Sequence, residues 1–167
     1  ALAKRNVRNN TPPMAIQPPT QGNTVINMPK TRDMFARCRT DDPDQQRGST
    51  GAEIHELEDN LQIRLPSAYR EFLSFAGAFE MDGPYVGSDC FLHHLPKLQV
   101  QFLDYMAKTR VLHGHDGDWF AFYGHQGYDW AWFYFDGEEN PLVYHFDETK
   151  HSTVQIVASL DDFFATS

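Results

Sequence analysis

The stretch from Asp118 to Asp147 constrains the fold more than any other part of the chain. It contains three short runs rich in aromatic and β-branched residues, at 119–123, 130–135 and 142–146. Loops with Gly, Asp, Asn and Pro separate these runs, and this pattern is typical of consecutive antiparallel strands. No charged residue interrupts 130–135, so we expect a central strand that is buried on both faces. The stretch therefore predicts a β-meander.

The central run places two tryptophans on one side of its strand. Successive side chains of a strand point to opposite faces, so Trp130, Trp132 and Tyr134 share one face. Large rings most often supply core area, which makes an aromatic core the ordinary interpretation. The alternative is that one face of this strand is a recognition surface.

Two helices are expected before the meander. Thr50 and Glu53 have the spacing of a capping box, and apolar residues follow at helical spacing as far as Leu61. Ser67 is placed to cap a second helix, which Gly77 would end. Both helices have an apolar face that needs a core to cover it.

Further elements complete an α+β fold in which helices flank the antiparallel sheet. Residues 98–106 predict a third helix, and 85–86 and 90–92 are candidate short strands. Residues 153–157 alternate like a fourth strand, and Ser159 is placed to cap a last helix.

Charge divides the chain into two parts. Residues 1–39 hold seven Lys or Arg and one acid, a net charge of +6, so a total of −9 leaves −15 for the remainder. The proline pairs at 12–13 and 18–19 favour an extended segment, and 31–39 has the pattern of a short helix. We therefore predict a basic, Pro-rich arm or linker over 1–48 and a folded domain over 49–167. An ordered arm is expected to dock on the acidic body.

The same charge limits the partners. Phosphate would be repelled by the acidic body, so nucleic acid is not expected and a basic protein is favoured. No apolar run approaches the roughly 20 residues that cross a bilayer, so no membrane partner is expected. Two cysteines, Cys38 and Cys90, are too few for a disulfide scaffold and predict a reducing, cytoplasmic location.

Several short segments, in this order, resemble the SUKH superfamily, which includes bacterial immunity proteins and the yeast regulator of cell-wall assembly. The matching segments are 51–58, 63–73 with its Leu-Pro-Ser-Ala-Tyr-Arg-Glu-Phe-Leu core, Gly77, 119–122, 125–128, 140–144 and 159–164. Ala76 is a departure, because many relatives have Asn before this glycine. The resemblance covers about residues 49–165 and leaves the basic arm unexplained.

The resemblance implies a non-enzymatic module that binds and neutralises a cognate toxin, often a nuclease. A regulatory or structural interaction module without a toxin is the alternative. The partner-binding residues would be Tyr128, Asp129, Trp130, Trp132, Asp136, Glu138 and Glu139. The ordinary alternative is that the rings belong to the core and the carboxylates to a solvated hairpin.

Histidines raise an enzymatic alternative. His113 and His115, followed by Asp116, offer nitrogen and oxygen ligands at short spacing, so a metal-dependent hydrolase is the enzymatic alternative to the binding module. The spacing is not diagnostic, and we predict neither a metal nor another cofactor. Cys90 and His93 could form a catalytic dyad only if both partners came from one local segment, whereas the partners of such a dyad usually come from distant segments. No phosphate-binding glycine loop is present.

The turn at His125–Tyr128 has a structural interpretation as well. Gly127 can supply a positive φ that fixes the entry to the next strand.

Overall fold

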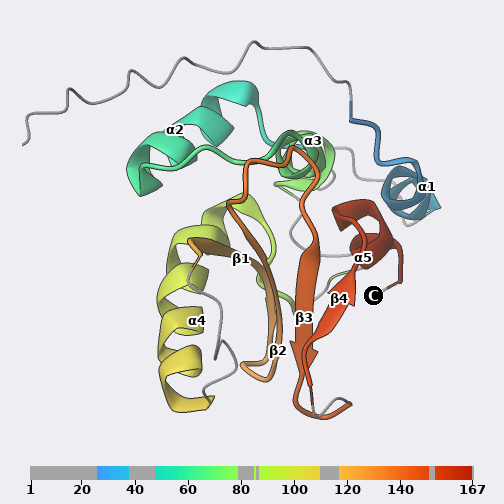
Figure 1. The fold of residues 1–167 in the computed structure, drawn as a ribbon. Helices are drawn as coiled ribbons and strands as arrows, with labels where there is room; N and C mark the ends of the chain where they lie inside the picture. The colour runs from blue at the N-terminus through green and yellow to red at the C-terminus, as the bar shows by residue number, and fades with distance from the viewer. Residues whose placement is uncertain are drawn as a thin grey trace, which may run out of the picture.

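The computed structural model describes residues 26–37, 48–78, 85, 87–109, 117–150 and 153–166 (Figure 1). Its helices are α1 (Pro29–Arg37), α2 (Gly51–Leu61), α3 (Ser67–Ala76), α4 (Leu95–Thr109) and α5 (Leu160–Thr166), with a 3-10 turn η2 at Leu92–His94. Its strands are β1 (Trp119–His125), β2 (Asp129–Tyr134), β3 (Val143–Asp147) and β4 (Gln155–Val157). None of the helices in this part of the chain is long and apolar enough to cross a membrane.

The sheet confirms the predicted meander. Its order is β1-β2-β3-β4, and every neighbouring pair is antiparallel. β2 is central, and only Tyr134 among its residues is half-exposed. The predicted strand at 90–92 is wrong, because Leu92 begins η2, and the nearby extended contact is an isolated bridge between Ser88 and His125.

A β-bulge in β1 alters the alternation of its side chains. Ala121 pairs with Trp132, whereas Tyr123, two residues on, pairs with the adjacent Ala131. Phe122 is the extra residue, so Phe122 and Tyr123 both point to the same face of the sheet. Both rings contact Phe163 of α5.

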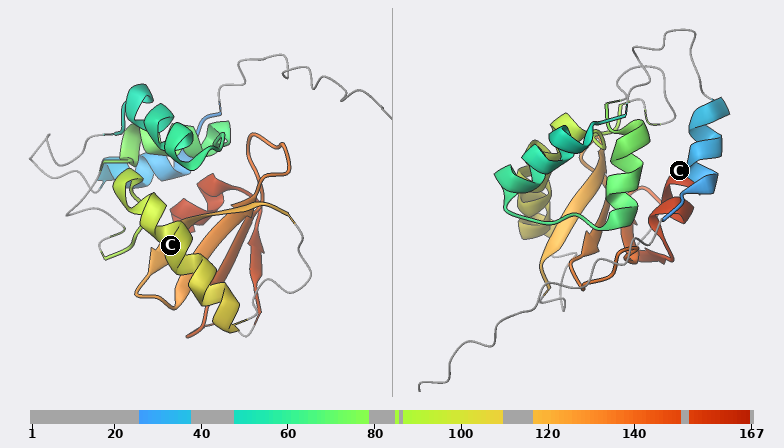
Figure 2. Two further views of the ribbon diagram at one scale, coloured as in Figure 1. Left: turned by 90° about the vertical axis from the view of Figure 1, so that its left-hand side faces the viewer. Right: turned by 90° about the horizontal axis from the view of Figure 1, so that it is seen from above.

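Helices lie on both faces of the sheet (Figures 1 and 2). α4 crosses one face. On the other, the ring of Tyr69 from α3 packs 5.9 Å from Phe133 and 5.6 Å from Phe122. Phe72 of α3 stacks on Phe164 of α5, with ring centroids 3.9 Å apart. This aromatic layer forms the main core.

The capping box of α2 is confirmed. The Glu53 amide donates to Thr50 Oγ1 at 3.2 Å, and the Thr50 amide donates to the Glu53 carboxylate at 2.7 Å. At α5, Ser159 Oγ accepts from the Asp162 amide at 3.1 Å, which also confirms the predicted cap. Local sequence was sufficient for both because donor and acceptor lie three residues apart.

Helix α1 docks on the body through charge and two buried side chains. The Thr31 amide and hydroxyl donate to Asp161 Oδ1 at 2.9 and 2.8 Å, and Lys30 pairs with Asp162. Met28 and Phe35 are buried in the core. The docking expected of an ordered arm is therefore seen for residues 26–37, while the proline pairs lie outside the described residues.

The outer edge of β1 is closed by polar groups. The Gln99 side chain of α4 donates to the Ala121 carbonyl at 2.7 Å and accepts from the Ala121 amide at 3.1 Å. Further along, the backbones of Asp89 and Gly124 exchange two hydrogen bonds at 2.7 and 3.2 Å. These contacts satisfy backbone groups that an outer strand would otherwise leave open.

Candidate protein-binding surface

The tryptophans of β2 lie beneath α4. The ring of Phe102 lies 5.4 Å from that of Trp130 and 5.1 Å from that of Trp132, and Tyr105 lies 5.3 Å from Trp130. Trp130 is 4% exposed and Trp132 is 1% exposed. These two predicted partner-binding residues therefore supply core area in the structure, and neither presents an open ring face to a partner.

Asp129 is also placed inside the fold. Its Oδ1 lies 2.7 Å from Nε2 of His145, and its Oδ2 accepts from the Tyr123 hydroxyl at 3.5 Å. The carboxylate is buried against His145 and Tyr123, so it cannot act as the steering charge that the sequence suggested.

The three predicted acids of the β2–β3 loop have different roles. Asp136 accepts from the Glu138 amide at 3.0 Å and shapes the turn. Glu138 is exposed. Glu139 accepts from the Ser67 amide at 2.7 Å and from the Ser67 hydroxyl, so it caps α3 from 72 residues away.

This contact corrects the predicted cap of α3. Ser67 is the first helical residue, and Pro66 stands at the cap position without a side-chain hydrogen bond. The hydrogen bonds from the Ser67 hydroxyl and amide lower the pKa of Glu139. Glu139 is thus a structural acid, and Asp136 and Glu138 remain as surface charges.

Tyr128 lies at the opposite end of β2 from these acids. It is half-buried, its hydroxyl donates to Gln126 Oε1 at 3.4 Å, and its ring packs edge-on against His125. The structure therefore does not bring Tyr128 together with the loop acids. Gln126 and Gly127 have φ of 49° and 81°, which confirms the positive φ expected of Gly127.

An apolar strip on β3 and β4 was not predicted. Tyr144 pairs with Trp132 on one side and with Ile156 on the other, so all three side chains share the face that carries α4. Along the β3 and β4 segments that face carries five apolar side chains by alternation. We call them the β3–β4 strip: Leu142, Tyr144, Phe146, Val154 and Ile156.

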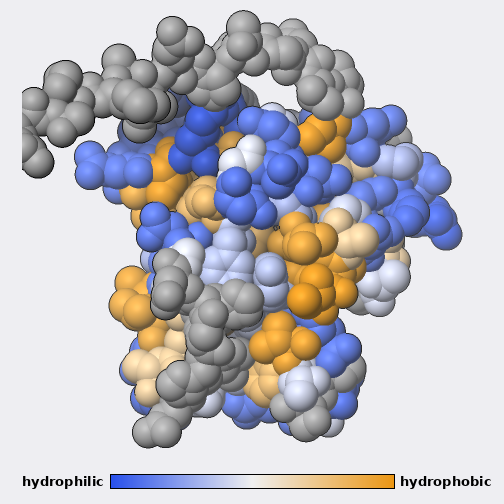
Figure 3. All heavy atoms as spheres, viewed as in Figure 1, coloured by the Kyte–Doolittle hydropathy of each residue, from blue (hydrophilic) through white to orange (hydrophobic). Residues whose placement is uncertain are grey.

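The β3–β4 strip is open to solvent. Ile156 is 63% exposed, Leu142 is exposed, and the other members are half-buried. Figure 3 shows hydrophobic side chains gathered over β3 and β4. Among the described elements, α4 packs chiefly along β1 and does not extend over this part of the face. The alternation of residues 153–157 was a signal for the strip. The sequence does not show, however, how far α4 extends across the sheet.

The enzymatic alternatives find no support among the described residues. No group of three His, Cys, Asp or Glu side chains there is arranged to hold a metal, while His113, His115 and Asp116 lie outside those residues. Burial raises the pKa of the Cys90 thiol, which keeps it protonated at neutral pH.

The sequence did not predict a contact between a serine and a histidine. Ser88 Oγ lies 3.0 Å from Nδ1 of His125, and Ser88 is buried. The contact sits beside the isolated bridge between the same two residues. A buried hydroxyl cannot reach a substrate, so the pair fixes the edge of β1.

Comparison with known proteins identifies a family. The model of the SMI1 / KNR4 family (SUKH-1) matches residues 48–166, which begin after α1 and include all the described strands. No curated protein and no solved structure matches the chain.

Proposed function

The chain belongs to the SMI1 / KNR4 family (SUKH-1), and from this premise we propose that it is an immunity protein that binds and neutralises a cognate toxin. Members of this family are in general immunity or regulatory proteins without catalytic activity. The observation that carries the proposal is the open β3–β4 strip. Binding, unlike catalysis, needs no more than such a complementary surface.

The β3–β4 strip has the composition of an interface core. It combines the rings of Tyr144 and Phe146 with the exposed side chain of Ile156. Contiguous apolar surface of this kind marks interaction sites, and aromatic residues are enriched at interface centres. Tyr144 also stacks on the buried Trp132 at 6.0 Å, so its ring is held in place before binding.

Charge supports a basic partner. The family region, 48–166, holds six Lys or Arg and nineteen Asp or Glu, a net charge of −13. Asp136 and Glu138 lie in the loop that leads into the strip at Leu142. Nuclease toxins hold phosphates and tend to be basic, so an acidic rim around an apolar centre suits such a toxin.

The experiment compares two substitutions at sites of similar exposure, 63% for Ile156 and 68% for Val100. Tagged protein is used to capture the partner from the source cell, and the partner is identified by mass spectrometry and tested for toxicity and for release by salt. Ile156→Asp should weaken binding at least tenfold, or about 1.4 kcal/mol. Val100→Asp on the outer side of α4, where the side chain is 68% exposed, should bind like the parent.

The outcomes separate the surface from the function. If Val100→Asp weakens binding and Ile156→Asp does not, the outer side of α4 is the binding surface. A captured partner that is not toxic, or whose toxicity the protein does not relieve, favours a regulatory interaction module without a toxin. Family membership supports that second function as well.

A further inference from the structure

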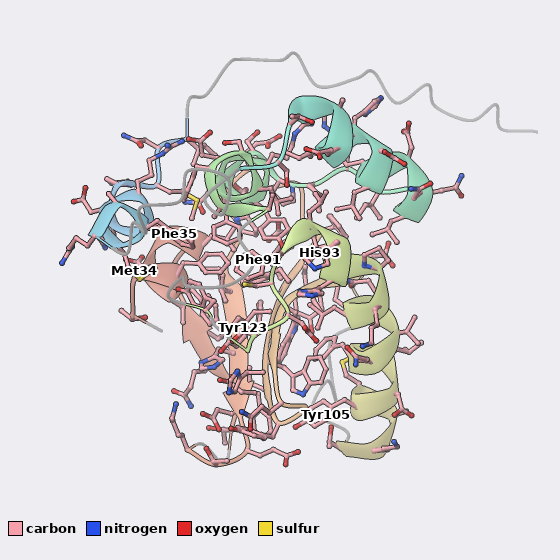
Figure 4. The ribbon with its side chains drawn as sticks, turned by 180° about the vertical axis from the view of Figure 1, so that it is seen from behind. Met34, Phe35, Phe91, His93, Tyr105 and Tyr123 are labelled. Carbon is pink, nitrogen blue, oxygen red and sulfur yellow. The ribbon has the colours of Figure 1, made fainter. Side chains whose placement is uncertain are left out.

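A hollow of about 620 Å³ lies between the C-terminal half of α4 and the β1–β2 turn. Two aromatic residues, Tyr105 and Trp130, are part of its wall, and three carboxylates line it, from Asp89, Asp104 and Glu148. Tyr105 lies between α4 and the sheet in Figure 4. We call this feature the α4 hollow.

Glu148, an exposed residue, is held in the α4 hollow by a tyrosine hydroxyl. The Tyr105 hydroxyl donates to Glu148 Oε1 at 2.7 Å. Burial, and then this hydrogen bond, raise the pKa of Tyr105, so it remains a donor at neutral pH. Among the described residues no Lys, Arg or His forms an ion pair with Glu148.

The other charges of the α4 hollow do not cancel. Lys108 lies 2.6 Å from Asp104 and neutralises that carboxylate. Asp89 lies 3.6 Å from Nδ1 of His94, which is charged only when protonated. The three carboxylates and the Lys108 ammonium together give the described lining of the hollow a net charge of −2.

The α4 hollow continues the β3–β4 strip. Tyr144, Phe146 and Glu148 follow one another at alternate positions, and the Glu148 amide donates to the Tyr128 carbonyl at 3.0 Å, so the chain remains paired with its neighbour. An occupant of the strip therefore reaches the α4 hollow at its end. Trp130, which pairs with Phe146, forms the shared wall.

We propose that the α4 hollow receives an arginine side chain of the protein that covers the β3–β4 strip. The chemistry favours arginine over other groups, because a planar guanidinium donates two parallel hydrogen bonds to a carboxylate. Glu148 supplies the carboxylate, and the small exposed parts of Tyr105 and Trp130 form an apolar wall for the methylenes of the side chain. This inference rests on the proposed protein-binding function and specifies a feature of the partner.

The direct test uses small probes and the full chain. The Trp130 indole N–H donates to the Gly127 carbonyl at 3.2 Å in the wall, so its NMR signal reports occupancy. N-acetyl-argininamide should shift this signal saturably, whereas the neutral isostere N-acetyl-citrullinamide should not. Glu148→Gln should weaken the arginine probe at least fivefold, because a charge-assisted hydrogen bond is lost while Gln can still accept from Tyr105.

Glu138→Gln is the matched control, since it removes the same charge from an exposed acid at the other end of the sheet. Equal binding to Glu148→Gln and Glu138→Gln, equal shifts with citrulline, or no saturable shift at all would overturn the proposal. Equal binding of N-acetyl-lysinamide would overturn the assignment to arginine. Partner capture that depends on Ile156 but not on Glu148 would leave the proposed function intact and refute the α4 hollow alone.

Discussion

The two halves of the sheet carry similar side chains in different surroundings. Trp132 of β2 and Tyr144 of β3 are paired across the strands and stacked at 6.0 Å. The tryptophan is buried beneath α4, and the tyrosine is half-exposed. An aromatic residue on this face of the sheet is therefore core or surface according to the position of α4, and its own chemistry does not decide which.

The largest expected difference between the halves is in stability. Trp132→Ala removes a buried ring and should lower the free energy of unfolding by about 3–5 kcal/mol. Ile156→Ala, on the same face of the open half, should change it by no more than about 0.5 kcal/mol. Urea denaturation of both variants measures the contrast, and similar losses would show that the β3–β4 strip is also core.

A smaller effect is expected at the turn that joins the two strands of the covered half. Gly127→Val forces a β-branched residue to a φ of 81° and should cost about 1–3 kcal/mol. A Cβ at Gly127 would meet nothing within 4 Å, so the cost comes from the backbone.

Gly51→Val is the control, because Gly51 is equally unhindered and begins α2. Thermal melts should place it within about 0.5 kcal/mol of the parent. A Gly127→Val protein that melts like the parent would refute the role of the turn.

The smallest effect is expected at the loop that joins the two halves. Glu139→Gln weakens the cap on α3 and should cost about 1 kcal/mol at neutral pH. Because the folded state lowers the pKa of Glu139, this stability is present above the ordinary glutamate pKa and is lost as pH falls through the lowered value.

The difference between parent and Glu139→Gln in thermal melts should therefore shrink below about pH 4. Glu138→Gln, one residue earlier, should follow the parent at every pH. A difference from the parent that persists undiminished in acid would show that the carboxylate charge does not make the cap.

The features predicted from sequence are those determined by near neighbours. The capping box at Thr50 and Glu53 spans three residues, and Gly127 acts within its own turn, so local pattern was sufficient. The cap of α3 was assigned to Ser67 because its true acceptor, Glu139, is distant in sequence. The bulge at Phe122 was not predicted either, since no local sequence signal marks a bulge.

The candidate site was harder to predict than the fold. Alternation grouped Trp130 and Trp132 on one face but did not show that α4 would cover them. The β3–β4 strip is the part of the face that α4 does not cover. Its extent depends on how the helix packs on the sheet, which is a tertiary property. The charge asymmetry was more informative, because opposite charges attract each other even when they are far apart in the sequence. Helix α1 docks through Lys30 and Asp162, as that asymmetry suggested.

Gln99 has a consequence for how copies of this protein can associate. Its amide, with the backbone of Asp89, occupies the outer side of β1, and β4 is the other outer strand. Within the described part of the chain, strand-to-strand annealing can therefore start only at β4. If two copies joined edge to edge through β4, each would lose its open strand edge and no third copy could be added. The architecture therefore disfavours growth into a continuous cross-β fibre.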